Sequence, residues 1–246
     1  GAGIPEKMRR FFCDNIQGNS AVITGDDAHH IARVLRMRVG DALSLCDGAG
    51  REFDAAITAV TQSEIVCEVG NAHESGAESP CKVTLFQCLP KTGKFETIVQ
   101  KCTELGVFAV VPVFSSRCVV VPDKDFDKKR ERYQRVALEA AKQSRRAAVP
   151  DVLPLIKISS IDPKQFDLFL VAYEEEETRS LKAALKQAGS FTTIGLLIGP
   201  EGGLTQEEVD RLTQNGAVSV SLGRRILRTE TAGMAMLAQT LYEVEP

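Results

Sequence analysis

Three short segments of unusual composition are the parts of this sequence best suited to bind a ligand. The first, Leu197-Ile-Gly-Pro-Glu-Gly-Gly-Leu204, follows an apolar run and precedes helix-capping signals. Its three glycines let a ligand approach the backbone closely, and the amino terminus of the following helix favours negative charge. The segment matches neither G-x-x-x-x-G-K-[ST] nor G-x-G-x-x-G, and Glu201 would be an awkward neighbour for a phosphate. A tight strand-to-helix turn without a ligand is the alternative interpretation.

The second and third segments also follow apolar runs. Residues 221–232 combine three arginines with the pair Ile226-Leu227, which suits a flat apolar ligand beside an anion. Residues 171–177 end in four glutamates that could bind ribose hydroxyls or an ammonium group, although such a run also suits a solvated helix start. Because parallel strands bring their carboxyl ends to one sheet edge, we expect all three segments to form one pocket.

Other chemistries are poorly supported. The three histidines, His29, His30 and His73, lie far from these segments in the sequence, and no H-E-x-x-H spacing occurs. A catalytic triad and a metal site are therefore not expected. The seven cysteines include no C-x-x-C pair, which indicates free thiols in a reducing, cytoplasmic compartment.

The elements that must position these segments fall into two parts. Short apolar runs between Gly and Asp turns predict a small β-barrel over residues 8–72, interrupted by a helix at about 26–37. The polar segment 73–80 is the expected linker, and residues 1–7 are expected to be an expression scar. From residue 81 to 246 strands and helices alternate, which predicts an α/β domain on a mostly parallel sheet. The expected strands are 83–89, 107–113, 152–156, 168–173, 193–198 and 218–222, and the expected helices are 95–105, 128–144, 180–187, 206–215 and 230–243.

Composition excludes several classes. Of the 246 residues, 43% are apolar and 26% charged, which is typical of a globular protein and excludes disordered, collagenous and coiled-coil chains. No apolar run reaches the roughly 18 residues of a membrane helix, so no membrane association is expected. The net charge of −3 argues against a general nucleic-acid coat, but Lys and Arg cluster between Lys124 and Arg146.

The segments 197–204 and 222–232 together resemble the RsmE family of small-subunit ribosomal RNA methyltransferases, of the SPOUT class. Further matching segments are Met8-Arg-Arg-Phe-Phe12, His30-Ile-Ala-Arg-Val-Leu-Arg36 with Gly40-Asp41, Leu89-Pro-Lys91, Gln100-Lys-Cys-Thr-Glu-Leu-Gly106, and Glu139-Ala-Ala-Lys-Gln-Ser-Arg-Arg146 with Pro150. The resemblance runs from Met8 to the C-terminus. Arg224 stands where the family often has Pro, and Lys142 where an acid is common.

This resemblance implies both a fold and an activity. The fold would be a PUA-like RNA-binding β-barrel followed by a SPOUT-type α/β domain with a C-terminal trefoil knot. The protein would be a homodimer that uses S-adenosylmethionine, without a metal, to methylate N3 of one uridine in the 16S rRNA of the small ribosomal subunit. The residues expected to bind the cofactor are Ala172, Tyr173, Glu174, Ile198, Gly199, Pro200, Glu201, Gly202, Gly203, Leu222, Gly223, Ile226, Leu227, Arg228, Thr231 and Ala232.

The chemistry of this transfer is compatible with the residues. A sulfonium makes a carboxylate such as Glu201 a tolerable neighbour, and ionised uracil spreads negative charge onto two carbonyl oxygens that an arginine can stabilise. We expect Arg10, with Arg228 or Arg146, to supply that charge. Glu230 is a candidate base, although a glutamate at a helix start more often caps the helix.

RNA contacts are expected from basic residues in both parts of the chain, namely Arg9, Arg10, Arg33, Arg36, Lys128, Arg132 and Arg146. The basic helix could instead be a solvated amphipathic helix, since Glu131 and Glu139 neutralise part of it. The sequence leaves two alternative functions. A ribosome-assembly factor would keep the RNA contact with a vestigial cofactor pocket, whereas a nucleotide hydrolase would need the Lys-Ser/Thr pair that is missing after the glycine-rich segment.

Overall fold

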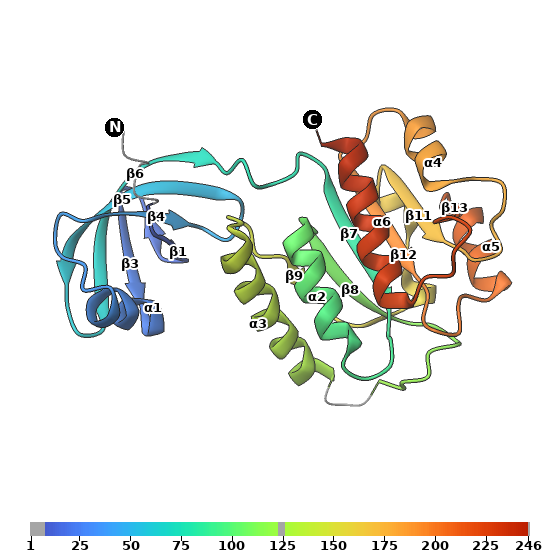
Figure 1. Ribbon diagram of the computed structural model, residues 1–246, viewed down its shortest axis with the longest axis horizontal. Coiled ribbons are helices and arrows are strands. Elements are labelled where there is room, and N and C mark those ends of the chain that lie inside the picture. Colours follow the sequence, from blue (N-terminus) through green and yellow to red (C-terminus); the bar gives the residue numbers. More distant parts are fainter. Residues whose placement is uncertain (1–7, 123–125, 246) are drawn as a thin grey trace. The chain divides into compact units, whose positions relative to one another are not determined.

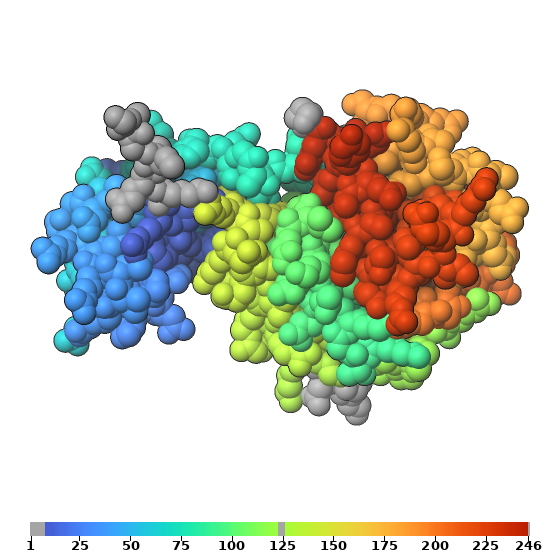
Figure 2. Space-filling model, in the orientation of Figure 1, coloured from blue at the N-terminus to red at the C-terminus, as the bar shows by residue number. Residues whose placement is uncertain are grey.

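A computed structural model describes residues 8–122 and 126–245. Residues 1–7, which were expected to be an expression scar, lie outside the described residues. The chain forms two compact units, drawn as a ribbon in Figure 1 and as a space-filling view in Figure 2. The first unit extends to Glu78 and also contains Arg145–Val149. The second unit comprises Ser79–Ser144 and the chain from Pro150 onward.

The first unit is a mixed six-stranded sheet with strand order β1-β4-β5-β6-β3-β2. Only β1 and β4 pair in parallel. Two register shifts between β5 and β6 bend the sheet, as bulges do. Because β1 and β2 form the two edges and do not pair, the described strands of the predicted small β-barrel make a half-barrel. The strands are β1 (Arg10–Phe12), β2 (Ile16–Gln17), β3 (Ser20–Thr24), β4 (Ala42–Cys46), β5 (Arg51–Val60) and β6 (Glu64–Glu74).

Alternation of apolar residues along β5 and β6 gives the half-barrel its core, because successive side chains of a strand point to opposite faces. Ile57 and Ile65 are fully buried there, together with Leu43 and Leu45 of β4. The predicted helix at 26–37 is a five-residue α-helix, α1 (Gly25–His29), that continues as one π-helical segment, η1 (His30–Val34). Its inward residue Ile31 closes one side of this core.

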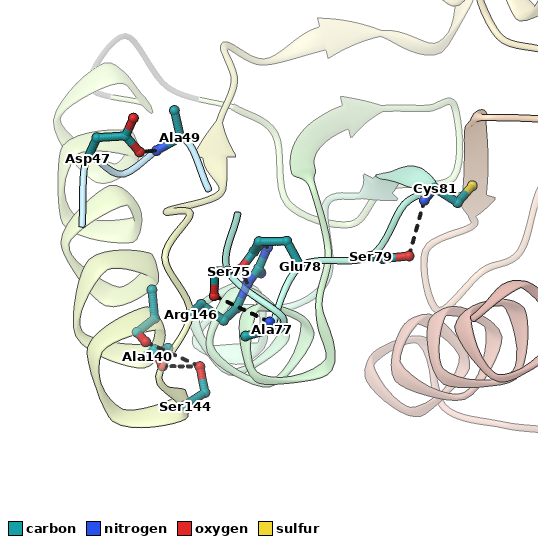
Figure 3. Close-up of polar contacts among 11 residues, drawn as sticks. Asp47, Ala49, Ser75, Ala77, Glu78, Ser79, Cys81, Ala140, Ser144 and Arg146 are labelled. Carbon is teal, nitrogen blue, oxygen red and sulfur yellow. Dashed lines mark hydrogen bonds and ion pairs between the residues drawn. The ribbon is translucent and has the colours of Figure 1, made fainter. Parts of the chain in front are cut away.

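The predicted linker begins too early. Residues 73 and 74 belong to β6, where they pair with Glu52 and Arg51, so backbone pairing outweighs their polar composition. The first unit is completed by Arg145–Val149, whose backbone pairs with the turn between β4 and β5. The Val149 N–H donates a hydrogen bond to Gly48 O at 2.9 Å. Figure 3 shows Arg146 of this segment beside Glu78, with its Nη2 2.7 Å from Glu78 Oε1.

The second unit is the predicted α/β domain, and its sheet is wholly parallel. The strand order is β10-β8-β7-β12-β11-β13, with β9 also paired to β8. The strands are β7 (Lys82–Cys88), β8 (Ala109–Phe114), β9 (Asp151–Val152), β10 (Ile156–Lys157), β11 (Leu168–Ala172), β12 (Thr193–Ile198) and β13 (Val218–Val220). The expected strand 152–156 is two short strands, because Leu153-Pro154-Leu155 interrupts the pairing and proline has no N–H to donate.

Helices cover both faces of this sheet. On one face α2 (Lys94–Leu105) packs between α3 (Phe126–Ser144) and α6 (Thr229–Val244), and α4 (Leu181–Ala188) packs on α6 (Figure 1). On the other face α5 (Gln206–Gln214) places Val209 and Leu212 on the aromatic cluster of Phe86 and Phe169. Two short 3₁₀ segments, η2 (Ile158–Ser160) and η3 (Pro163–Gln165), lead into β11. No helix in the described part of the chain is long and apolar enough to span a membrane.

Candidate active site

Loops that leave the carboxyl ends of neighbouring strands enclose a cavity of about 460 Å³ in the second unit. All three segments selected from the sequence contribute to it, as the parallel sheet requires. The loops after β7 and β8 add further residues. The lining residues are Lys91, Lys94, Arg117, Ala172, Tyr173, Glu174, Glu175, Ile198, Gly199, Pro200, Glu201, Gly203, Leu204, Ser221, Leu222, Gly223, Arg224, Arg225, Ile226, Leu227, Arg228, Thr229 and Ala232.

The glycine-rich loop after β12 is a tight turn that only glycines permit. Gly203 has φ of 71°, and its N–H donates to Pro200 O at 2.9 Å. A Cβ at Gly202 would lie 3.1 Å from Arg117 Cβ. The loop ends in the predicted capping box, in which Thr205 and Glu208 satisfy each other's backbone at the start of α5. The turn therefore places the backbone of Gly199 and Gly203 at the wall of the cavity.

Arg117, which the sequence did not single out, holds this loop from the side. Its Nη1 donates to Gly202 O at 3.1 Å and to Leu204 O at 3.4 Å. The neighbouring Ser116 N–H donates to Glu208 Oε1 at 2.9 Å. The loop after β8 thus fixes the glycine-rich loop and places a guanidinium at the edge of the cavity.

The arginine-rich segment forms the opposite wall of the cavity. Gly223 has φ of 118°, and its N–H donates to Ser221 Oγ at 3.2 Å, which turns the chain after β13. Ile226 is 90% exposed although it is apolar, so a bound ligand would gain by covering it. Leu222 and Leu227 are half-buried beside it.

A buried hydroxyl joins these walls to the sheet. Thr229, the first residue of α6, accepts a hydrogen bond from Gln87 Nε2 at 2.8 Å and donates to Gly199 O at 2.7 Å. Thr229 is 5% exposed and Gln87 is fully buried. A single side chain therefore links the start of α6 to strand β7 and to the glycine-rich loop.

Charges of both signs surround the glycine-rich loop. Glu201 Oε1 accepts the backbone N–H of Lys91 at 2.9 Å and lies 3.5 Å from Lys94 Nζ, which is also 3.2 Å from Glu230 Oε2. Burial raises the pKa of Glu230, but its own backbone N–H and Lys94 outweigh this and leave the pKa lowered. Glu230 is therefore ionised at neutral pH.

The acidic segment after β11 serves two purposes. Glu174 and Glu175 line the cavity. Glu176 instead accepts hydrogen bonds from Ser219 Oγ at 2.6 Å and Thr178 Oγ1 at 2.6 Å, which lower its pKa to about 2. Glu176 thus holds the turn that presents its two neighbours.

The structure brings together most of the residues predicted to bind a cofactor. Fourteen of the sixteen line the cavity. The exceptions are Gly202, which faces Arg117, and Thr231, which is exposed on α6. Nine further residues line the cavity without having been named as cofactor-binding residues, namely Lys91, Lys94, Arg117, Glu175, Leu204, Ser221, Arg224, Arg225 and Thr229.

The predicted catalytic and RNA-binding residues lie in both units. Arg228 and Glu230 belong to the second unit. Arg10 lies in the first unit, where Nε is 3.1 Å from Glu52 Oε1 and Nη1 donates to Arg145 O at 2.5 Å. The remaining RNA-binding candidates are exposed, namely Arg9, Arg33, Arg36, Lys128 and Arg132, with the exception of Arg146. Arg146 is 5% exposed and paired with Glu78, which counts against its predicted contact with RNA.

Cys118, the residue after Arg117, forms a thiol pair with Cys88 at the end of β7. A hydrogen bond from Cys88, with further bonds from Ser115, lowers the pKa of Cys118 to about 6 despite its partial burial. All seven cysteines are free, and six are buried. Among the described residues no group of three His, Cys, Asp or Glu side chains could hold a metal ion.

Comparison with known proteins relates both units to enzymes that act on RNA. A family model for an RNA methyltransferase domain matches residues 77–241, and one for an RNA methyltransferase PUA domain matches residues 23–70. Ribosomal RNA small subunit methyltransferase E of Bacillus subtilis is 39% identical over 91% of this chain and 90% of its own length. The enzyme of the same name from Neisseria gonorrhoeae, solved with S-adenosyl methionine, is 30% identical, with a TM-score of 0.79 over 96% of this chain and 97% of the other. A Legionella pneumophila methyltransferase solved with the same cofactor is 28% identical, with a TM-score of 0.79 over 96% of this chain and 98% of the other.

Proposed function

Because the chain belongs to the ribosomal RNA small subunit methyltransferase E family, we propose that it methylates N3 of one uridine in the 16S rRNA of the small ribosomal subunit. Its cofactor is S-adenosylmethionine. The observation that carries the proposal is the cavity, to which the loops after β11, β12 and β13 contribute most of the predicted cofactor-binding residues. Family resemblance further supports a trefoil knot in the second unit and activity in the cytoplasm, where bacterial ribosomes act.

The cavity residues fit this cofactor. Leu222, Ile226 and Leu227 offer apolar walls to an adenine ring, and the glycine-rich loop offers backbone donors and acceptors. Glu201 Oε2 is buried and has no hydrogen-bond partner among the residues that the structure describes. A buried carboxylate oxygen without a partner suits a cationic ligand, because desolvation otherwise costs free energy. The cofactor supplies an electrophilic methyl group when bound.

The chain's own groups would orient the uracil and stabilise its ionised form. Uracil N3 loses its proton to solvent water, and the resulting charge on its two carbonyl oxygens is stabilised by guanidinium groups, for which we propose Arg228 and Arg10. Glu230 is a weak base because its pKa is lowered and Lys94 holds its carboxylate. We therefore assign Glu230 to positioning Lys94 rather than to accepting the N3 proton.

The RNA would also contact basic residues outside the cavity. Arg9, Arg33 and Arg36 are exposed on the unit that matches the PUA family, and Lys128 and Arg132 are exposed on α3. Phosphate contacts of this kind make binding salt-dependent. A variant in which Lys128 and Arg132 are replaced by Gln should reduce the salt dependence of RNA binding, whereas an unaltered slope would indicate a solvated helix.

We also propose that the protein is a homodimer. Between α4 and α6 an apolar groove is lined by Leu181, Leu185 and Ala238, and Tyr242 at its edge is 84% exposed. Exposed apolar surface of this kind is typical of an interface. Sedimentation of the wild-type chain should show a dimer that Tyr242→Glu weakens, and a monomer at micromolar concentration would contradict the proposal.

Methyl transfer tests the activity directly. Tritiated S-adenosylmethionine is incubated with small ribosomal subunits from a strain that lacks this modification, and label should be recovered as 3-methyluridine. Arg10→Ala should lower the transfer rate at least tenfold while the affinity for the cofactor stays unchanged. Full transfer by this variant would remove Arg10 from the mechanism. Cofactor binding without transfer to the subunits would refute the proposed substrate.

A further inference from the structure

One ammonium group is shared by two carboxylates at the edge of the cavity. Lys94 Nζ lies 3.5 Å from Glu201 Oε1 and 3.2 Å from Glu230 Oε2. The three residues come from the start of α2, the glycine-rich loop and the start of α6. All three side chains are partly buried, with 28% of Lys94 and 21% of each glutamate exposed.

The stability of α2 does not explain a lysine at this position. Lys94 is the first residue of the helix, where the macrodipole disfavours a positive charge. The preceding Gly93 has φ of 86° and provides no side-chain cap. Partly exposed ion pairs also contribute little to folding. The position of Lys94 is therefore unfavourable for the helix, and its two carboxylate partners point to a role at the cavity.

The geometry leaves a defined charge facing the ligand. Lys94 and Glu201 both line the cavity, whereas Glu230 supports Lys94 from outside it. Glu201 Oε1 is already engaged by Lys94 and by the Lys91 N–H, and its Oε2 is the buried oxygen without a partner among the described residues. One positive and two negative groups leave the cluster with a single net negative charge.

We propose that Lys94 is a specificity-determining residue that sets how strongly the pocket prefers the sulfonium cofactor over its neutral thioether product. This inference rests on the proposed function. With Lys94 present, the cluster attracts a cationic ligand by the equivalent of one carboxylate. Without Lys94 the charge of both carboxylates would act on the cationic ligand. The pocket would then bind the sulfonium cofactor more tightly relative to the neutral thioether product.

Neighbouring charges do not alter the comparison. The other charged residues that line the cavity are Lys91, Arg117, Glu174, Glu175, Arg224, Arg225 and Arg228. Because these groups are the same in every variant, their effects cancel when the ratio of two dissociation constants is compared between variants. A general loosening of the pocket weakens both ligands and leaves the ratio unchanged, so the ratio separates the charge effect from a structural one.

The test measures dissociation constants for S-adenosylmethionine and S-adenosylhomocysteine by calorimetry at pH 8, with no RNA present. Relative to wild type, Lys94→Met should raise the preference for S-adenosylmethionine by about threefold to tenfold, the effect of one charge at a partly solvated site. Glu201→Gln should lower the preference. Glu230→Gln should lower it as well, without changing a residue that lines the cavity, and so tests the same claim independently.

Two controls test the role of the Lys94 charge: one keeps that charge, and the other removes a different charge of the same helix. Lys94→Arg should keep the wild-type ratio within twofold. Lys101→Met removes a lysine of the same helix that pairs with Glu104 at 3.1 Å outside the cavity, and should also leave the ratio unchanged. An unchanged or lowered preference in Lys94→Met, or an equal change in Lys101→Met, would overturn the inference. A wild-type chain that binds neither ligand would refute the proposed function itself.

Discussion

Replacing Thr229 by valine should destabilise the active site more than its size suggests. Valine has nearly the same shape but lacks the hydroxyl that joins Gln87 to Gly199. The change leaves one buried N–H of Gln87 and the carbonyl of Gly199 without this partner. A buried polar group left unsatisfied costs about 1–3 kcal/mol. Because the Gln87 N–H and the Gly199 carbonyl can each regain part of this cost by relaxation, we expect the free energy of unfolding to fall by about 3 kcal/mol.

This loss should appear in both stability and binding. In a domain of this size about 3 kcal/mol corresponds to a fall of roughly 6–12 °C in melting temperature. Affinity for S-adenosylmethionine should fall about tenfold or more, because the glycine-rich loop loses its attachment to α6. Thr229→Ser keeps the hydroxyl and should recover most of both losses. Calorimetry measures each quantity on the same samples.

The same helix provides a matched control. Thr240 is also fully buried, but its hydroxyl donates at 2.7 Å only to Met236 O, one turn earlier in α6. Helix carbonyls already accept a backbone bond, so Thr240→Val should cost well under 1 kcal/mol. Gln87→Met combined with Thr229→Val should recover part of the loss, because it removes the donor that the valine orphaned. Equal destabilisation by the two threonine changes would refute this account of the network.

Three further outcomes are expected. Gly202→Ala should weaken cofactor binding, because the added Cβ would lie 3.1 Å from Arg117 Cβ. Gly76→Ala should leave the affinity unchanged, because its Cβ would have nothing within 4 Å. Equal affinities of the two variants in a titration would contradict this prediction. Alkylation of Cys118 by iodoacetamide should rise with pH around a midpoint near 6 and already be close to maximal at pH 7, and a midpoint above 8 would be inconsistent with its hydrogen bonds. The folded pKa of Glu176 is lowered to about 2 from 4.5, so its contribution to stability should be complete above pH 5 and be lost as pH falls toward 2. In urea titrations, the difference in unfolding free energy between wild type and Glu176→Gln should therefore shrink over that interval.

The parts of the site that the sequence could predict are those encoded by local signals. Strand β12 was predicted with its observed bounds because its apolar run is bounded by turn residues. The capping box of Thr205 and Glu208 marked the start of α5. The glycines between β12 and this capping box marked the exposed turn. The parallel sheet then required the loops after β11, β12 and β13 to meet.

The parts that were missed depend on contacts across the fold. Arg117 and Lys94 are charged residues in short segments after strands, where a charge by itself gives no sign that it faces a cavity. Thr229 resembles any first residue of a helix until its partners Gln87 and Gly199 are known. The loops after β7 and β8 also leave the carboxyl ends of parallel strands, where ligands bind. This position points to both loops, but not to these particular side chains.

The division between the two units failed for a related reason. Residues 73 and 74 are polar and resemble a linker, yet they extend β6 because β5 offers unpaired backbone opposite them. Residues 145–149 resemble the end of a helix and its exit loop. Their long-range backbone bonds and the ion pair of Arg146 with Glu78 assign them to the half-barrel.

The position of Arg145–Val149 limits how the RNA-binding half can be separated or reused. The chain passes between the two units three times, after Glu78, Ser144 and Val149. A fragment that ends at Glu78 would lack Ala147, which is fully buried, and would leave Glu78 without Arg146. Unlike a domain joined by one tether, the half-barrel therefore cannot be transplanted as a continuous cassette. An insertion or a protease cut at 145–149 should damage the half-barrel, although these residues follow a helix of the methyltransferase unit.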